Sequence, residues 1–295
     1  MKKRLQDKVA IVTGAGGGLG RTHALELARH GARVVVNDLA GRDDAAAARA
    51  VADEIRRHGG EAMAHAGDVT SAADMQAMAD AALARWGRID ILVNNAGILR
   101  DKSFAKMSID DFRLVLDVHV MGAVNATKAV WAPMQAQRHG RIVMTTSSSG
   151  LYGNFGQSNY GAAKMALVGL MQTLALEGAK YGVHVNCLAP TAATAMTEGV
   201  LPPEALARLT AERVSPGLLA LVGDEAPTRM ILLAGAGSFE SANITMTQGV
   251  HLGDAADVAE RLCARLDEVT ARTGETVPAS GWEQYRLELA KAVPA

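Results

Sequence analysis

A tyrosine and a lysine four residues apart, Tyr160 and Lys164, follow a serine at position 147. Positions four apart on a helix share a face, so the Lys164 ammonium can lie near the Tyr160 hydroxyl. Because a nearby cation favours the phenolate, we expect the pKa of Tyr160 to be lowered. The pattern predicts general acid/base chemistry at Tyr160, electrostatic support from Lys164 and a hydrogen bond from Ser147 to the reacting oxygen.

A glycine-rich turn follows a short apolar run near the start of the chain. The general G-x-G-x-x-G fingerprint fails from Gly14 because Leu19 occupies its third glycine position. The spacing T-G-x-x-x-G-x-G does fit, through Gly14, Gly18 and Gly20. Missing side chains let the backbone approach a pyrophosphate at the amino end of a helix. We expect these three glycines and Leu19 to bind a dinucleotide; the alternative is a glycine-rich turn with no ligand.

Asp38 ends the second apolar run, where the adenosine ribose of a dinucleotide would lie. Its carboxylate can accept hydrogen bonds from both ribose hydroxyls and would repel a 2′-phosphate. This repulsion is worth roughly 1 to 4 kcal/mol at about 4 Å, so the sequence favours NAD over NADP. Arg42 could soften the preference by reaching a phosphate. In the alternative interpretation, Asp38 only caps a turn.

Alternating apolar runs and amphipathic stretches predict an α/β fold, a doubly wound, Rossmann-like parallel sheet in a single domain with a helical C-terminal tail. Strands are expected near 8–13, 33–37, 61–66, 90–93, 141–146, 183–188 and 243–246, and helices near 19–30, 44–58, 71–86, 109–138, 158–180 and 224–234.

The predicted dinucleotide-binding domain covers residues 1–253 and the helical extension covers 254–295. Three prolines interrupt the periodicity between 191 and 222, which predicts a loop with short helices, the place for a substrate lid. Beyond position 253, helices are expected at 255–272 and around 282–290.

Composition excludes several classes of function. A net charge of −1 gives no basic footprint for nucleic acid or a membrane surface. Two cysteines, Cys187 and Cys263, are too few for a disulfide framework or a thiolate zinc site, so we expect no metal and a reducing, cytoplasmic location. The apolar run from Val9 to Val12 is too short for a signal-peptide core, and no stretch approaches the length of a membrane span, about 20 apolar residues.

Together these motifs resemble the short-chain dehydrogenase/reductase family, from about Lys8 to Gly253. The resemblance extends to Asp68-Val69 and to Asn94-Asn95-Ala96-Gly97. It implies that Asp68 and Val69 border the adenine, and that Asn95 and Gly97 support the central part of the cofactor. Alternatively, the Asn-Asn-Ala-Gly loop chiefly braces the sheet.

A closer likeness rests on three segments, Val36 to Leu39, Ala96 to Ala105 and Gly150 to Gln157. They resemble the (3R)-hydroxyacyl-CoA dehydrogenase unit of the multifunctional enzyme of peroxisomal fatty-acid β-oxidation. This implies a 3-hydroxyacyl thioester substrate. The chain is expected to carry the dehydrogenase part alone.

Two positions depart from the family pattern. His119 stands where most members have an Asn whose backbone carbonyl holds a water, and we interpret it as a structural replacement in a proton-relay position rather than a new base. Thr191 stands where the family has Gly, before a Thr that holds the nicotinamide amide. Thr194 or Thr197 could serve there.

The sequence thus predicts an oxidoreductase that transfers a hydride between NAD and a secondary alcohol or ketone, with a 3-hydroxyacyl-CoA as the preferred substrate. The alternatives are a 17β-hydroxysteroid or other bulky-alcohol dehydrogenase and, without catalysis, an NAD-binding regulatory or scaffold protein. Small residues on the helix that carries Tyr160 predict a homodimer or homotetramer.

Overall fold

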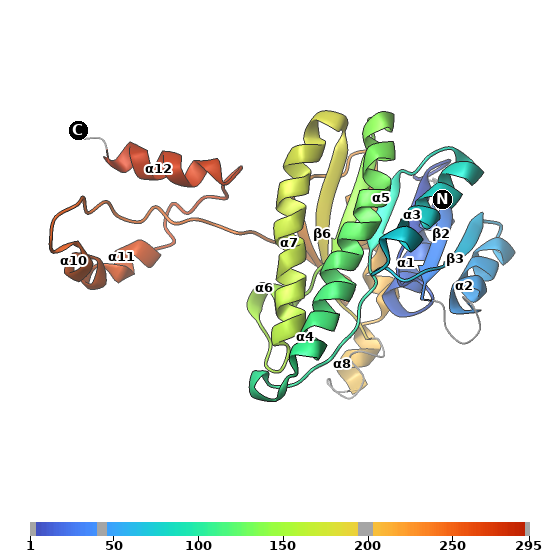
Figure 1. Ribbon diagram of the computed structural model, residues 1–295, viewed down its shortest axis with the longest axis horizontal. Helices are drawn as coiled ribbons and strands as arrows, with labels where there is room; N and C mark the ends of the chain where they lie inside the picture. Colours follow the sequence, from blue (N-terminus) through green and yellow to red (C-terminus); the bar gives the residue numbers. More distant parts are fainter. Residues whose placement is uncertain (1–3, 40–45, 194–202, 293–295) are drawn as a thin grey trace. The chain divides into compact units, whose positions relative to one another are not determined.

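The computed structural model describes residues 4–39, 46–193 and 203–292 (Figure 1). The chain forms two compact units, Met1–Ser241 and Ala242–Ala295, which are described separately. Within the described residues, none of the helices is long and apolar enough to cross a membrane.

The first unit is built on one sheet, which within the described residues has eight strands in the order β3-β2-β1-β4-β5-β6-β7-β8. Every registered pair from β3 across to β7 is parallel. The order reverses beside β1, and in such sheets ligands bind at the carboxyl ends of the strands at this switch point. The predicted doubly wound α/β fold is confirmed. The strands are β1 (Val9–Val12), β2 (Arg33–Asp38), β3 (Ala62–Ala66), β4 (Ile91–Asn94), β5 (Gly140–Thr145), β6 (Val183–Thr191), β7 (Ile231–Gly235) and β8 (Ser238–Ala242).

Helices cover both faces of the sheet because its central strands are apolar on both sides, with β1, β4 and β5 buried along their whole length. One face packs against α1 (Gly18–Arg29), α2 (Ala46–Arg57) and α9 (Ser215–Val222). The other face carries α3 (Ala72–Trp86), α5 (Gly122–Gln137) and α7 (Ser158–Gly178), which Figure 1 shows in front of the sheet.

The helix predicted over 109–138 is interrupted. It divides into α4 (Ile109–Leu116), a π-helical turn at Asp117–Met121 and α5. Such a turn inserts an extra residue into the helical ladder and often occurs at functional sites. A short helix that the sequence did not predict, α6 (Ser148–Tyr152), follows β5 directly.

Two predicted elements near residue 240 are wrong. The helix expected at 224–234 is a turn followed by β7, because Pro227 interrupts the segment and the apolar run after it pairs with β6. A short apolar run does not distinguish a strand from a buried helix. Residues 243–246 form no strand and make only an isolated bridge, from Met246 to Thr276.

Short helices occur between 203 and 222, as expected: α8 (Pro203–Arg208), a 3-10 turn at Ala211–Arg213 and α9. In the C-terminal unit the helix predicted over 255–272 is split by Arg265 into α10 (Val258–Ala264) and α11 (Leu266–Thr270). The last helix, α12 (Trp282–Ala292), matches its prediction closely.

Candidate active site

Ser147 lies at the carboxyl end of β5, where the chain turns into α6. It is the N-cap residue of that helix, with extended backbone angles, and its Oγ accepts a hydrogen bond from the Ser149 N–H at 3.2 Å. A serine in this position satisfies one of the free donors of the first helical turn. Because an oxygen lone pair is used there, the Ser147 hydroxyl hydrogen is left to donate to another group.

Tyr160 and Lys164 lie on the first two turns of α7, and the structure brings both next to this serine turn. The Lys164 Nζ is 5.4 Å from the centre of the Tyr160 ring and donates to the Thr145 carbonyl at 2.6 Å. Only 3% of Lys164 is exposed, and burial lowers its pKa to about 7. The three residues that the sequence singled out therefore converge at the carboxyl edge of the sheet.

The predicted direction of the Tyr160 pKa shift is wrong for the protein without a cofactor. Burial raises the pKa of Tyr160; a hydrogen bond with Ser147 opposes this shift, and the charge of Asp101 adds to it. The cost of taking a phenolate out of water is the largest of these contributions, and the buried Lys164 directs its Nζ at a backbone carbonyl.

His119 lies in the π-helical turn and packs edge-on against Tyr160, with ring centres 5.3 Å apart. Its Nε2 lies 2.9 Å from the Ile98 carbonyl and 3.1 Å from the Ile98 N–H, while its buried Nδ1 has no partner among the described residues. Burial and the Lys164 charge lower its pKa to about 3. With so low a pKa the imidazole is neutral and a very weak proton acceptor at physiological pH, which supports a structural role over that of a base.

The glycine turn between β1 and α1 adopts a conformation that only glycine accepts readily. Gly14 and Gly18 have φ of 61° and 51°, and a Cβ on Gly20 would lie 2.2 Å from the Gly14 carbonyl oxygen. Within the described residues, no side chain caps the first turn of α1. The start of this helix therefore offers free N–H groups, beside Leu19, and the close backbone approach that a pyrophosphate needs.

Asp38 stands at the end of β2 and faces this turn. Its Oδ2 accepts from the Gly16 N–H at 2.6 Å and its Oδ1 accepts from the Leu39 N–H at 2.7 Å. A Cβ on Gly16 would lie 2.5 Å from the same carboxylate oxygen. Asp38 therefore braces the glycine turn, and its carboxylate is fixed where the resemblance puts the adenosine ribose. Arg42 lies outside the described residues.

Asn95 binds the end of β1 rather than facing open space. Its Nδ2 donates to the carbonyls of Thr13 and Gly14 at 2.9 and 3.0 Å. A Cβ on Gly97 would lie 2.3 Å from the His119 ring. These contacts show that the Asn-Asn-Ala-Gly loop braces the sheet; contact of Asn95 and Gly97 with a cofactor stays a prediction.

Asp68 and Val69 follow β3 at the same edge. The Asp68 carboxylate accepts from the Thr70 N–H at 2.8 Å, and Val69 is buried against Gly122 of α5. Their predicted place beside the adenine stays untested. Thr194 and Thr197, the candidates for the nicotinamide amide, lie outside the described residues.

Asn95 and Gly97 were predicted site residues of the loop after β4, but the sequence did not single out Arg100 and Asp101 further along the same loop. Asp101 of this loop accepts from the Gln157 Nε2 at 2.6 Å, and Asn159 donates from its Nδ2 to the Arg100 carbonyl at 3.0 Å. The two segments are more than fifty residues apart in the chain. Their only sequence signal is that Asp101 and Gln157 belong to segments quoted for the closer resemblance, whereas Asn159 lies just outside them.

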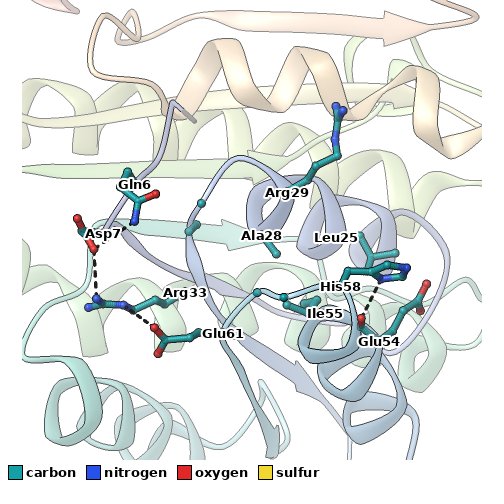
Figure 2. A pocket seen from close by; sticks show the side chains of 14 residues that line it. Gln6, Asp7, Leu25, Ala28, Arg29, Arg33, Glu54, Ile55, His58 and Glu61 are labelled. Atoms are coloured by element: carbon teal, nitrogen blue, oxygen red, sulfur yellow. Dashed lines mark hydrogen bonds and ion pairs between the residues drawn. The ribbon is translucent and has the colours of Figure 1, made fainter. Parts of the chain in front are cut away.

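A cavity of about 510 Å³ lies at the opposite edge of the sheet, among the starts of β1, β2 and β3 (Figure 2). Arg33 binds Asp7 at 3.2 Å and Glu61 at 3.4 Å along its wall. None of the predicted catalytic or cofactor-binding residues lines it. The residues of the chemical motifs and this cavity therefore lie at different ends of the strands.

Comparisons with known proteins identify the family. The family model for short chain dehydrogenases matches residues 8–204. A short-chain type dehydrogenase/reductase of Mycobacterium tuberculosis is 46% identical over 279 residues, 92% of this chain and 97% of its own. The peroxisomal multifunctional enzyme A of Dictyostelium discoideum is 45% identical over 260 residues, which cover 86% of this chain and 58% of that protein.

Solved structures agree. The full-length peroxisomal multifunctional enzyme type 2 of Drosophila melanogaster has a TM-score of 0.80 at 37% identity over 98% of this chain and 51% of its own. A 7α-hydroxysteroid dehydrogenase complexed with NADH and a bile-acid ketone has a TM-score of 0.73 at 32% identity, over 80% of this chain and 96% of its own. The chain thus spans little more than half of the two peroxisomal enzymes. By sequence, fold and site geometry, it belongs to the short-chain dehydrogenase/reductase family, whose members are oxidoreductases acting on CH–OH groups with NAD or NADP.

Proposed function

We propose that the protein transfers a hydride between NAD and the secondary alcohol of a 3-hydroxyacyl thioester. The observation that carries the chemistry is the convergence of Ser147, Tyr160 and Lys164 at the same carboxyl edge of the sheet as the glycine turn. The substrate class is supported by the three segments that resemble a (3R)-hydroxyacyl-CoA dehydrogenase unit and by the peroxisomal relatives.

The residues of the site divide the work. When bound, NAD would accept the hydride from the carbinol carbon. Tyr160 takes the hydroxyl proton during oxidation and returns it to the carbonyl oxygen during reduction. Ser147 donates a hydrogen bond to that oxygen, and Lys164, while it carries its proton, stabilises the phenolate as it forms. Because burial raises the pKa of Tyr160, the phenol is the resting form and oxidation should be faster at alkaline pH.

The preference for NAD is supported by Asp38, whose carboxylate is held at the glycine turn by two backbone N–H groups. A 2′-phosphate placed there would meet a fixed negative charge. Asp38→Ser removes the charge and keeps a short hydrogen-bonding side chain. We expect kcat/KM with NAD to exceed that with NADP at least about tenfold in the wild type, and the ratio to narrow in the variant.

A homo-oligomer is supported by large apolar side chains that the first unit leaves exposed: Leu114 on α4, Met121 in the π-helical turn, and Met165 and Leu176 on α7. A homodimer or homotetramer would cover them. Light scattering at micromolar concentration tests this. The cytoplasmic location expected from Cys187 and Cys263, both free thiols, stays a prediction.

A second candidate function is dehydrogenation of a steroid or another bulky alcohol, favoured by the likeness to the hydroxysteroid dehydrogenase structure. The non-catalytic alternative is a scaffold that binds the cofactor without turnover. Steady-state assays with NAD against 3-hydroxyacyl-CoAs, hydroxysteroids and simple secondary alcohols separate the three. Higher kcat/KM for a steroid would overturn the thioester proposal, and cofactor binding without oxidation of any alcohol would favour the scaffold.

A further inference from the structure

Gln157 connects two segments that flank the catalytic tyrosine. Its side-chain carbonyl accepts from the Ser149 hydroxyl at 2.8 Å and from the Asn154 amide at 3.2 Å. Its amide nitrogen donates to the Asp101 carboxylate at 2.6 Å. Two donors on the oxygen and one acceptor on the nitrogen fix the orientation of the amide group. The side-chain oxygen of Gln157 therefore accepts only from donors, and its side-chain nitrogen donates to an acceptor.

The backbone reinforces this connection. The Lys102 N–H donates to the Gly156 carbonyl at 2.9 Å, and the Gly161 N–H donates to the Gln157 carbonyl at 2.7 Å. Asn159, which is fully buried, holds the Arg100 carbonyl with its Nδ2 and accepts from the Tyr160 N–H at 2.7 Å. The loop after β4 is thus fixed directly onto the turn of chain that carries Tyr160.

The connection also reaches Ser147. Gln157 holds the side chain of Ser149, and the N–H of the same Ser149 donates to the Ser147 Oγ. The helix α6 packs tightly on α7, since a Cβ on Gly161 would lie 3.0 Å from the Ser149 carbonyl oxygen. A shift of Ser149 therefore moves the group that orients the reacting serine.

We propose that Gln157 is a positioning residue of the dehydrogenase reaction, which sets Ser147 through Ser149 and holds the Asp101 carboxylate toward Tyr160. The inference rests on the proposed proton transfer at Tyr160. Gln157 need not contact the substrate. Its serine arm, through Ser149, acts on the hydrogen-bond geometry of Ser147. Its charge arm, through Asp101, acts on the electrostatic field at Tyr160. Misplacement of reacting groups by about 1 Å can cost about a hundredfold in rate.

The electrostatic field at Tyr160 depends on four groups that face it. These are Lys164 on the same helix, neutral His119 from the π-helical turn, Ser147 from the end of β5 and Asp101 from the loop after β4. The two cations of that loop, Arg100 and Lys102, are paired with Asp111 at 3.9 and 3.2 Å. Asp101 is accordingly the negative charge that raises the pKa of Tyr160.

Three variants separate the arms. Gln157→Met keeps the length of the side chain and removes both arms. Gln157→Glu keeps oxygen acceptors for Ser149 and Asn154 but places a second negative charge beside Asp101. Asp101→Asn keeps an acceptor for the Gln157 amide and removes the charge. Gln172→Met is the matched control, since Gln172 lies on the far half of the same helix and also loses a side-chain hydrogen bond, the one from Arg229.

With whichever alcohol the wild type oxidises, Gln157→Met should lower kcat by about ten- to a hundredfold. Its Kd for NAD should stay near that of the wild type. Gln157→Glu should recover much of kcat and move the alkaline limb of the pH profile to higher pH. Asp101→Asn should move that limb to lower pH, because removing a negative charge favours the phenolate. Gln172→Met should leave kcat and the pH profile unchanged.

A readout without substrate keeps this inference separable from the proposed function. The phenolate absorbance of the cofactor-free protein, with the titration of Tyr160→Phe subtracted, reports the Tyr160 pKa directly. Asp101→Asn should lower it and Gln157→Glu should raise it. If no alcohol is oxidised, the proposed function fails while this titration still tests the charge arm. Equal loss of thermal stability in Gln157→Met and Gln172→Met, with kcat and the titration unchanged, would overturn the positioning role.

Discussion

The two edges of the sheet bury charged side chains in opposite ways. At the edge where the strands begin, the fully buried Asp90 accepts from the Val9 N–H at 2.9 Å and from Arg88 at 2.6 and 2.8 Å. At the same edge Lys8 pairs with Asp224 at 3.2 Å. At the edge where the strands end, Lys164 is as deeply buried, yet its Nζ binds only a carbonyl among the described groups.

Buried charges of the first kind stabilise the fold, whereas a buried charge of the second kind is suited to proton chemistry. A buried charge with a counterion and hydrogen bonds keeps its charge and ties strands together, whereas a buried charge without a counterion has its pKa moved toward neutrality. The pKa of Lys164 is lowered to about 7, while that of Tyr160, 5.4 Å away, is raised. Pairs of groups with perturbed pKa values are typical of catalytic sites. The Asp7–Arg33–Glu61 chain along the cavity of Figure 2 is instead a paired array.

The largest effect on activity is expected from a substitution at the edge where the strands end. Tyr160→Phe keeps the ring and its packing and removes the ionisable oxygen. We expect kcat to fall by about a hundredfold to ten-thousandfold or more, and the Kd for NAD to stay near that of the wild type. Tyr181→Phe is the control, since it makes the same change at the end of the 3-10 helix Ala179–Tyr181, and it should retain activity. A Tyr160→Phe protein that binds NAD and turns over within a few-fold of wild type would refute the mechanism.

At the opposite edge the largest loss should be of stability. Asp90→Ala leaves the Val9 N–H and Arg88 without their acceptor and should lower the free energy of unfolding by about 3 to 5 kcal/mol. Asp53→Ala, which breaks an exposed pair with Arg56, should change it by no more than about 0.5 kcal/mol. Denaturant titration measures both. Similar values for the two variants would show that the paired edge does not stabilise the sheet.

Residues whose relation is local could be predicted from the sequence. Tyr160 and Lys164 share a helix face because four residues make about one turn. The glycines of the turn after β1 could be recognised by their spacing. The contact between Asp101 and Gln157 could not be predicted, because it joins segments whose approach depends on the whole sheet. The direction of the Tyr160 pKa shift was missed for a related reason. Spacing places a cation beside the phenol, but burial, which no motif encodes, decides the sign.

Lys164 should make the wild type more stable at alkaline pH. Its pKa is lowered from 10.5 to about 7 in the folded protein, so between those values the unfolded chain binds more protons and stability rises with pH. Below pH 7 the buried ammonium carries its full cost. Lys164→Met removes this cost and should stabilise the protein at pH 6 by about 1 to 3 kcal/mol, less whatever the lost bond to Thr145 contributes. The gain should shrink toward pH 10; an equal change at both pH values would contradict the lowered pKa.

The smallest effect should come from His119, whose pKa of about 3 leaves it neutral throughout the working range. His119→Asn should therefore lower kcat by no more than about tenfold, less than general acid/base loss, and remove no limb from the pH profile between 5 and 9. Gly97→Ala tests what the ring does instead. Its new Cβ would lie 2.3 Å from the His119 ring and push it against Tyr160, so kcat should fall further than in His119→Asn. Because the smaller Asn relieves the clash, the double variant should be more active than Gly97→Ala alone. Additive losses in this cycle would show that the Gly97→Ala side chain does not act through the His119 ring. A lost limb near pH 6.5 in His119→Asn would make His119 a proton-transfer group rather than a packing residue.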